Sequence, residues 1–191
     1  MDVAFPERGR TAQAAAALFR LPELEPIEHA VARRPVTLPY IPGLLSFREL
    51  PAVIAALQAL SRCPDLVLCD GQGIAHPRRL GVAAHLGVIS GLPTIGVGKS
   101  RLLGRHADPG REKGDRVALL DGDERIGTVL RTRTGVRPVY VSPGHRVDFE
   151  DACRWVLACT GRYRLPEPIR MADRLAGGGC EGSESVNWLI G

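Results

Sequence analysis

Long apolar runs are absent from this sequence. No stretch approaches the roughly 20 consecutive apolar residues that a membrane-spanning helix requires. The first residues, MDVAF, have neither the basic start nor the long apolar core of a secretory signal peptide. We therefore expect a cytoplasmic protein that has no membrane partner.

Closely spaced cysteine pairs are also absent. The five cysteines form no C-x-x-C pair, and Cys69, Cys153 and Cys159 lie inside apolar segments. An odd number of cysteines without close pairs argues against a disulfide framework and against a structural zinc site. We expect buried, reduced thiols.

The rest of the composition is that of an ordinary folded domain. A chain of 191 residues, 45% of them hydrophobic and 24% charged, is long enough to bury one core. Arginine dominates the basic residues, which give a net charge of +4. A basic protein can bind a polyanion such as nucleic acid, but a preference for arginine gives the same charge. Charge alone therefore does not decide the function.

The first part of the chain predicts three strands. Residues 2–5, 11–19 and 27–36 are strand-like, and turn residues separate them. Alanine is a poor strand former, which makes the second segment the least regular of the three. We expect an antiparallel meander.

A helix follows after an irregular segment that contains Pro39 and Pro42. Ser46 is a good N-cap, and Glu49 stands three residues later as its capping-box partner. This pattern predicts a helix over residues 47–60.

The central stretch of the chain predicts a β-α-β unit. The short apolar run at residues 66–69 is typical of a buried strand and ends at Asp70, before a glycine-rich turn. A small-residue apolar segment at residues 80–90 predicts a helix, and residues 94–97 predict a second strand. Asp70 then lies at the carboxyl end of a strand, where open α/β sheets bind their ligands.

The remaining pattern completes a single α/β domain. We expect strands at residues 117–120, 126–131 and 139–142, and helices at residues 148–160 and 168–175. The order of elements fits a ribonuclease H-like mixed sheet with helices on both faces. We expect the domain to comprise residues 1–175 and residues 176–191 to form a disordered tail.

Three acids mark a candidate site. Asp2 lies on the first strand, Glu49 at the start of the first long helix and Asp70 at a strand end. If the first and fourth strands are neighbours, Asp2 and Asp70 meet, and the helix brings Glu49 over them. Carboxylates in such a group suit Mg²⁺ or Mn²⁺ and phosphoryl-transfer chemistry. Taken singly, each acid favours the plainer interpretation, which is a capping-box residue for Glu49 and a turn residue for Asp70.

Two further polar residues extend this candidate site. Lys99, directly after a buried strand, can bind a phosphate or stabilise developing negative charge. His76, in the glycine-rich turn, can hydrogen-bond a phosphate or orient a water, although a histidine beside proline and arginine is usually a surface-loop residue. The GKS sequence ending at Ser100 resembles a P-loop, but Pro93 stands where its first glycine is required, so we reject an ATPase.

Tyr40 has two interpretations. Between Pro39 and Pro42, it forms either a rigid aromatic wedge that stacks on a displaced base or an aromatic plug packed under a loop. The residue pattern alone leaves both open.

Five longer motifs stand out along the chain: PYIPGLLSFRE (39–49), DGQGIAHPRRLG (70–81), LPTIGVGKS (92–100), PVYVSPGHRVD (138–148) and YRLPEPIRMAD (163–173). Together they resemble the endonuclease V family, which cleaves nucleic acid near hypoxanthine (inosine). The resemblance covers the chain to about residue 175, and it implies a ribonuclease H-like fold.

The resemblance also implies roles for individual residues. The metal-binding acids correspond to Asp2, Glu49 and Asp70, with Glu49 acting through water, and the phosphate-contacting or second-sphere residues correspond to His76 and Lys99. The wedge corresponds to Tyr40, Ile41 and Pro42, and the base pocket to the backbone near Gly43, Leu45 and Gly71. Asp173 occupies a position where some members carry histidine, and either side chain can complete the metal environment.

The reaction implied by the resemblance is hydrolysis of the second phosphodiester bond 3′ to deoxyinosine in DNA repair. It uses Mg²⁺, for which Mn²⁺ substitutes, leaves a 3′-hydroxyl and a 5′-phosphate, and keeps the base. The partner is deaminated DNA, inosine-containing RNA is the alternative substrate, and we expect a monomer.

One departure from the family pattern concerns Asp2. Members usually have an N-terminal helix and a fuller first strand before this aspartate, whereas here it follows Met1 directly. A shortened central strand loses ladder hydrogen bonds. The departure motivates a second hypothesis, an inosine-binding protein with little or no cleavage.

Overall fold

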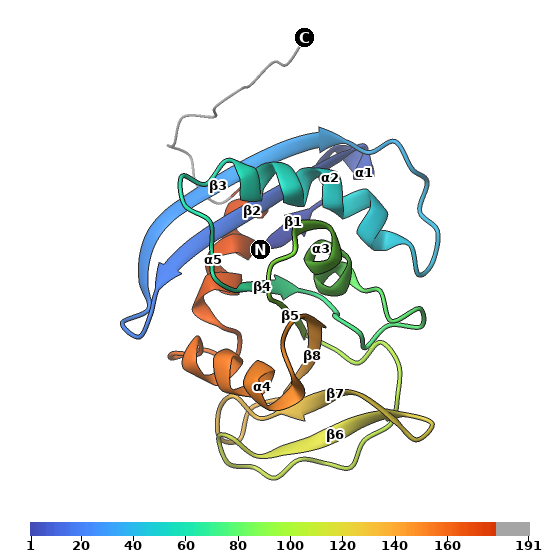
Figure 1. The fold of residues 1–191 in the computed structure, drawn as a ribbon, viewed down its shortest axis with the longest axis vertical. Helices are drawn as coiled ribbons and strands as arrows, with labels where there is room; N and C mark the ends of the chain where they lie inside the picture. The colour runs from blue at the N-terminus through green and yellow to red at the C-terminus, as the bar shows by residue number, and fades with distance from the viewer. Residues whose placement is uncertain (179–191) are drawn as a thin grey trace.

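The computed structural model describes residues 1–178 as eight strands and five helices (Figure 1). The strands are β1 (Asp2–Ala4), β2 (Thr11–Arg20), β3 (Glu25–Pro35), β4 (Val67–Asp70), β5 (Thr94–Gly98), β6 (Arg116–Asp121), β7 (Glu124–Leu130) and β8 (Val139–His145). The helices are α1 (Pro6–Gly9), α2 (Leu45–Gln58), α3 (Val82–Ser90), α4 (Phe149–Ala158) and α5 (Glu167–Ala176). The expected tail falls almost wholly on residues 179–191, which lie outside the described residues.

The predicted meander is confirmed. Strands β1, β2 and β3 form an antiparallel sheet in that order, with Asp2 opposite Ala15. The alanines of β2 are buried on both faces, because Ala14 and Ala16 pack in one core cluster with α2 while Ala15 packs in another with α5. Small side chains let helices approach the strand closely, which explains why a poor strand former occupies a central position.

The second sheet has the order β4-β5-β8-β7-β6. Strands β4 and β5 are parallel and are connected through α3, as the β-α-β pattern predicted, whereas the other pairs are antiparallel. Strands β6 and β7 form the predicted hairpin, in which Asp121 pairs with Glu124.

Met1 joins the two sheets. Its α-amino nitrogen donates to the carbonyl of Leu68 at 2.9 Å, and its carbonyl accepts from the backbone N–H of Asp70 at 3.0 Å. This is the bonding pattern of a parallel ladder, so β1 lies beside β4 as the candidate site requires. Met1 is buried, and burial lowers the pKa of its ammonium group.

Helices cover both faces of the combined sheet, as predicted. Val67 and Cys69 belong to a core cluster with residues of α2 and α3, whereas Leu68 between them belongs to a cluster with residues of α4 and α5. Alternate side chains of a strand point to opposite faces, so the two clusters lie on the two sides of β4. Figure 1 shows α2 and α3 on one side of β4 and α4 and α5 on the other.

The predicted capping box at α2 is wrong. The helix begins at Leu45, two residues earlier than expected, and its N-cap, Leu44, makes no side-chain capping bond. The hydroxyl of Ser46 instead lies 3.1 Å from Nδ1 of His85 on α3. A partner from a neighbouring helix therefore takes the hydroxyl that the sequence pattern assigned to a cap.

A cavity of about 630 Å³ lies beside Met1. It separates the end of β2, from Ala16 to Arg20, from the beginning of β4.

Cys69, Cys153 and Cys159 are buried free thiols, as expected, whereas Cys63 is exposed and free. Among the described residues, no helix has the length and apolar character that a bilayer crossing requires.

Candidate active site

Three carboxylates meet where β1, β4 and α5 converge. Asp2 begins β1, Asp70 ends β4 and Asp173 lies in the second half of α5. One oxygen of each lies within 4.8 Å of the others. The predicted meeting of Asp2 and Asp70 is confirmed by this geometry, and Asp173 supplies the third carboxylate.

The turn after Asp70 requires glycine. Gly71 has φ +146, a conformation that side chains rarely adopt, and a Cβ there would lie 2.7 Å from Cγ1 of Val82. Its N–H donates to the carbonyl of Val97 on β5 at 3.3 Å. The tight turn keeps Asp70 at the end of the strand while the chain reverses toward α3.

Lys99 lies against two of the carboxylates. Its Nζ is 2.6 Å from Oδ2 of Asp70 and 3.0 Å from Oδ1 of Asp173. Burial alone would lower the pKa of the ammonium group, but these two contacts outweigh it and raise the pKa above the ordinary lysine value. The lysine lowers the pKa of Asp173 in turn, with a smaller contribution from Asp2.

Asp2 has the opposite shift. Burial and the neighbouring charge of Asp70 raise its pKa to about 7, although the N–H of Val3 donates to Oδ1 at 2.7 Å and opposes the shift. A hydrogen bond with Asp173 also favours the protonated form of Asp2. Asp2 and Asp173 therefore share a proton near neutral pH when no cation is bound.

Glu49 lies beside this group of three but outside it. It shares with Asp2 and Asp70 a small cavity of about 10 Å³, roughly one water molecule in size. Burial, together with the charge of Asp70, raises the pKa of Glu49 to about 7. Because α2 has no capping box, the interpretation of Glu49 as a capping residue is wrong.

The donor set fits a hard divalent cation. Three converging carboxylate oxygens are the ligands that Mg²⁺ and Mn²⁺ accept. Oδ2 of Asp70 is buried and accepts no well-aligned hydrogen bond, although it faces the lysine charge. A buried acceptor without such a bond is costly unless a cation or water satisfies it.

His76 lies in the turn that follows the glycine-rich segment. It is buried, and its Nδ1 accepts from the backbone N–H of Arg78 at 3.3 Å, so in the neutral ring Nε2 carries the proton. Burial and the charge of Arg78 lower its pKa. The alternative of an ordinary surface-loop histidine is wrong.

The predicted wedge segment is exposed. Tyr40 has 66% of its surface exposed and Ile41 44%, so the alternative of a plug packed under a loop is wrong. Gly43 follows with φ +77, and a Cβ there would lie 3.9 Å from both the His76 ring and the Arg78 guanidinium. The segment therefore borders the His76 turn.

Sequence reasoning gave no role to Arg164. Its guanidinium donates to the carbonyl of Lys99 at 2.6 Å and to that of Pro138 at 2.7 Å, and so holds the backbone of the lysine. Its position in the YRLPEPIRMAD motif was the available signal. Lys99 itself directly follows β5, so the rejection of a P-loop is confirmed.

The family model of endonuclease V matches residues 1–174. Endonuclease V of Alkalilimnicola ehrlichii is 61% identical over 176 residues, which are 92% of this chain and 78% of that protein. The chain belongs to the endonuclease V family. The resemblance inferred from the five motifs is thereby confirmed, and the chain is a nuclease and hence a hydrolase.

Solved structures of the endonuclease V family share this fold. The crystal structure of Streptomyces avermitilis endonuclease V is similar, with a TM-score of 0.90 and 48% identity, covering 93% of this chain and 78% of that one. Ciona intestinalis endonuclease V, in complex with a 24mer DNA that contains an inosine followed by a ribo-adenosine, gives a TM-score of 0.79 at 28% identity, covering 93% and 83%. Nucleases of this family use a divalent metal.

Proposed function

We propose that this protein nicks deaminated DNA at the second phosphodiester bond 3′ to deoxyinosine and leaves a 3′-hydroxyl and a 5′-phosphate. We expect Mg²⁺ as the cofactor, with Mn²⁺ as a substitute, and a monomer in the cytoplasm. The group formed by Asp2, Asp70 and Asp173 within 4.8 Å is the observation that carries the proposal.

The four acids have two different roles in this proposal. Asp2, Asp70 and Asp173 would hold the metal, and Glu49 would act on it through the water-sized space that it shares with Asp2 and Asp70. The ion supplies a Lewis acid for the scissile phosphate and lowers the pKa of a bound water. All the carboxylates must be ionised for this role, so metal binding would release the proton that Asp2 retains near pH 7.

Lys99 and His76 would contact the phosphates. The ammonium group of Lys99 already lies at the acids, 2.6 Å from Asp70, and becomes available to a phosphate once a divalent cation occupies them. Neutral His76 would donate from Nε2, because Arg78 occupies its other nitrogen. Arg164 would support Lys99 through its backbone carbonyl.

Lesion recognition would fall to the exposed segment after β3. Tyr40, Ile41 and Pro42 would separate the strands, and the backbone near Gly43, Leu45 and Gly71 would surround the extruded base. The exposure of Tyr40 and the closeness of Gly43 to His76 support this assignment. Extrusion costs least at a mispaired base, which favours deaminated sites.

A deoxyinosine duplex tests the proposal. With Mg²⁺, the protein should give a single nick whose 5′-phosphate end can be ligated, whereas EDTA or an undamaged duplex should give none. Absence of the nick at high enzyme concentration, or an equal product from the Asp70→Asn variant, would overturn it.

Inosine-containing RNA is the second candidate substrate. The ribo-adenosine that follows the inosine in the DNA bound by the Ciona protein favours testing it. Competition between matched DNA and RNA substrates, each with one inosine, would decide the preference, because the two differ at the 2′-hydroxyl.

A further inference from the structure

The His76 turn contains a strained residue. Arg79 closes the turn, with its N–H donating to the carbonyl of His76 at 2.8 Å. Its backbone has φ 54, in the left-handed region that glycine adopts readily and arginine rarely. Something outside the turn must therefore hold this conformation.

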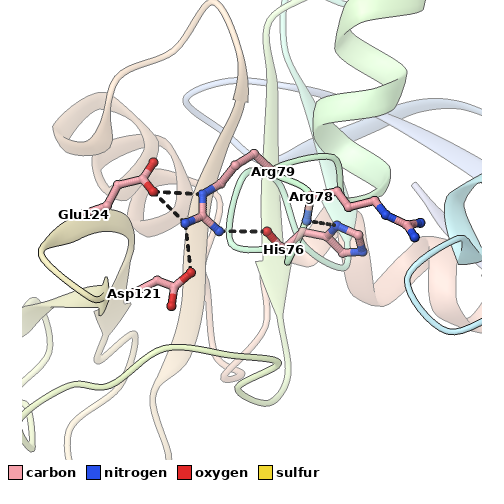
Figure 2. A network of polar contacts seen from close by, with 5 residues as sticks. All are labelled: His76, Arg78, Arg79, Asp121 and Glu124. Carbon is pink, nitrogen blue, oxygen red and sulfur yellow. Dashed lines mark hydrogen bonds and ion pairs between the residues drawn. The ribbon is translucent and has the colours of Figure 1, made fainter.

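The side chain of Arg79 provides that support. Its Nη1 donates to the carbonyl of His76 at 3.0 Å, while Nε and Nη2 reach Oε2 of Glu124 at 3.1 and 2.6 Å. Nη2 also reaches Oδ2 of Asp121 at 2.9 Å. Figure 2 shows the guanidinium of Arg79 between the His76 carbonyl on one side and the two acids on the other. Both acids flank the tip of the β6–β7 hairpin.

The next residue toward the N-terminus anchors the turn on its other side. Nη1 of Arg78 donates to the carbonyl of Gly43 at 3.3 Å, in the segment that borders the proposed base pocket. Figure 2 shows the side chains of Arg78 and Arg79 leaving the turn in opposite directions. The turn is thus held between the β6–β7 hairpin, through Arg79, and the backbone at Gly43, through Arg78.

We propose that Asp121 and Glu124 are positioning residues for nucleic acid binding, which act through Arg79 on the turn that presents His76 and Arg78. The inference rests on the proposed function, and it extends the binding machinery to a hairpin more than forty residues away. Neither acid belongs to the carboxylate group at the metal site.

The sign of the effect makes the inference testable. Neutralising an acid on a protein that binds nucleic acid removes repulsion from the phosphates, so it should strengthen binding by general electrostatics. If Asp121 and Glu124 position the turn, their neutralisation should instead weaken binding. The two mechanisms therefore predict opposite changes in Kd.

The hairpin offers a matched control. Asp123 lies between the two acids, fully exposed, and its ion pair is a loose one of 3.9 Å with Arg105 rather than with Arg79. The Asp123→Asn variant removes one negative charge from the same tip without touching the turn, so it matches each of the single variants Asp121→Asn and Glu124→Gln. Arg79→Gly removes the side chain while leaving a residue that adopts the left-handed backbone readily.

The experiment measures Kd for a deoxyinosine duplex in Ca²⁺ at about 0.1 M salt, where surface attraction is partly screened. We expect Asp121→Asn/Glu124→Gln to raise Kd about threefold or more, and Asp123→Asn to leave it unchanged or lower it. The triple variant with Arg79→Gly should match Arg79→Gly alone, and Arg79→Lys should lie between Arg79→Gly and wild type. An unchanged or lower Kd for the Asp121/Glu124 variant would overturn the inference.

A second measurement does not depend on the substrate. In the free protein, hydrogen exchange at the amides of Arg78, Arg79 and Gly81 should accelerate in Asp121→Asn/Glu124→Gln but not in Asp123→Asn. Unchanged exchange would overturn the role of the acids in the turn. Failure of wild-type protein to prefer the deoxyinosine duplex would overturn the proposed function. The exchange result would still show whether the two acids hold the turn, because it is measured without substrate.

Discussion

The Nζ atom of Lys99 lies 2.6 Å from Oδ2 of Asp70 and 3.0 Å from Oδ1 of Asp173. The lysine thus partly neutralises the carboxylates that would hold a metal. A divalent cation and this ammonium group compete for the same oxygens, and the consequences differ for metal binding and for catalysis.

Substitution of Lys99 separates these two consequences. Lys99→Met should bind Mn²⁺ more tightly than wild type, because a competing positive charge is removed, yet nick deoxyinosine DNA about 100-fold more slowly if the lysine stabilises charge at the phosphate. Titration with Mn²⁺ and single-turnover cleavage measure the two effects. Lys113→Met, which removes the other lysine of the chain from an exposed loop, is the control. Weaker Mn²⁺ binding by Lys99→Met would contradict the competition.

Asp70 is expected to be essential for the reaction. Asp70→Asn should lower the cleavage rate by about 1000-fold or more, because its side chain meets both other carboxylates and the lysine. Asp65→Asn, an exposed acid just before the same strand, should cleave like wild type. Circular dichroism and thermal unfolding of both variants would show whether the loss reflects the site rather than the fold.

Local sequence patterns predicted most of the fold. The meander, the β-α-β unit and the β6–β7 hairpin each consist of elements that follow one another along the chain and are separated by turn signals. The local sequence therefore predicts them. The predicted start of α2 is wrong because the hydroxyl of Ser46, which the local pattern assigned to a cap, contacts His85 from another helix. A local capping rule has no access to such a partner.

The candidate site was predictable only in part. The sequence predicts that Asp2 and Asp70 meet if β1 and β4 are neighbours, and the hydrogen bonds of Met1 with β4 provide that contact. Asp173 reaches them from α5, more than a hundred residues later, and only the family motif pointed to it. The ion pairs of Arg79 with Asp121 and Glu124 could not be predicted from the sequence, because the two acids lie in an ordinary hairpin turn.

Without a bound cation, Asp2 and Glu49 should contribute stability that is lost as pH rises from about 4 to 7. Unfolded carboxyl groups ionise near pH 4, whereas Asp2 and Glu49 keep their protons in the folded protein up to about pH 7. At these two groups the folded state binds more protons than the unfolded state, so their contribution to the free energy of unfolding falls as pH increases. Thermal unfolding in EDTA should show this contribution as a difference: wild type should lose Tm relative to Asp2→Asn, and relative to Glu49→Gln, as pH rises from about 4 to 7.

Added Mg²⁺ provides the complementary measurement. A divalent cation binds the ionised acids and not the protonated ones, so its stabilising effect should grow as pH rises through 7. A Tm difference between Mg²⁺ and EDTA that is equal at pH 5.5 and pH 8 would contradict the raised pKa values of Asp2 and Glu49. Asp123→Asn should behave like wild type in both series.

Tyr40 is predicted to affect recognition without affecting stability. The residue is 66% exposed, and the guanidinium of Arg48 lies 5.9 Å from the centre of its ring. Tyr40→Ala should therefore leave Tm almost unchanged, because little buried contact is lost. If the ring stacks on a displaced base, the variant should bind a deoxyinosine duplex about tenfold more weakly, since such stacking contributes roughly 1–3 kcal/mol per base. Tyr40→Phe keeps the ring and should bind like wild type. Equal losses in both variants would assign the effect to the hydroxyl, and a lowered Tm in Tyr40→Ala would assign it to packing.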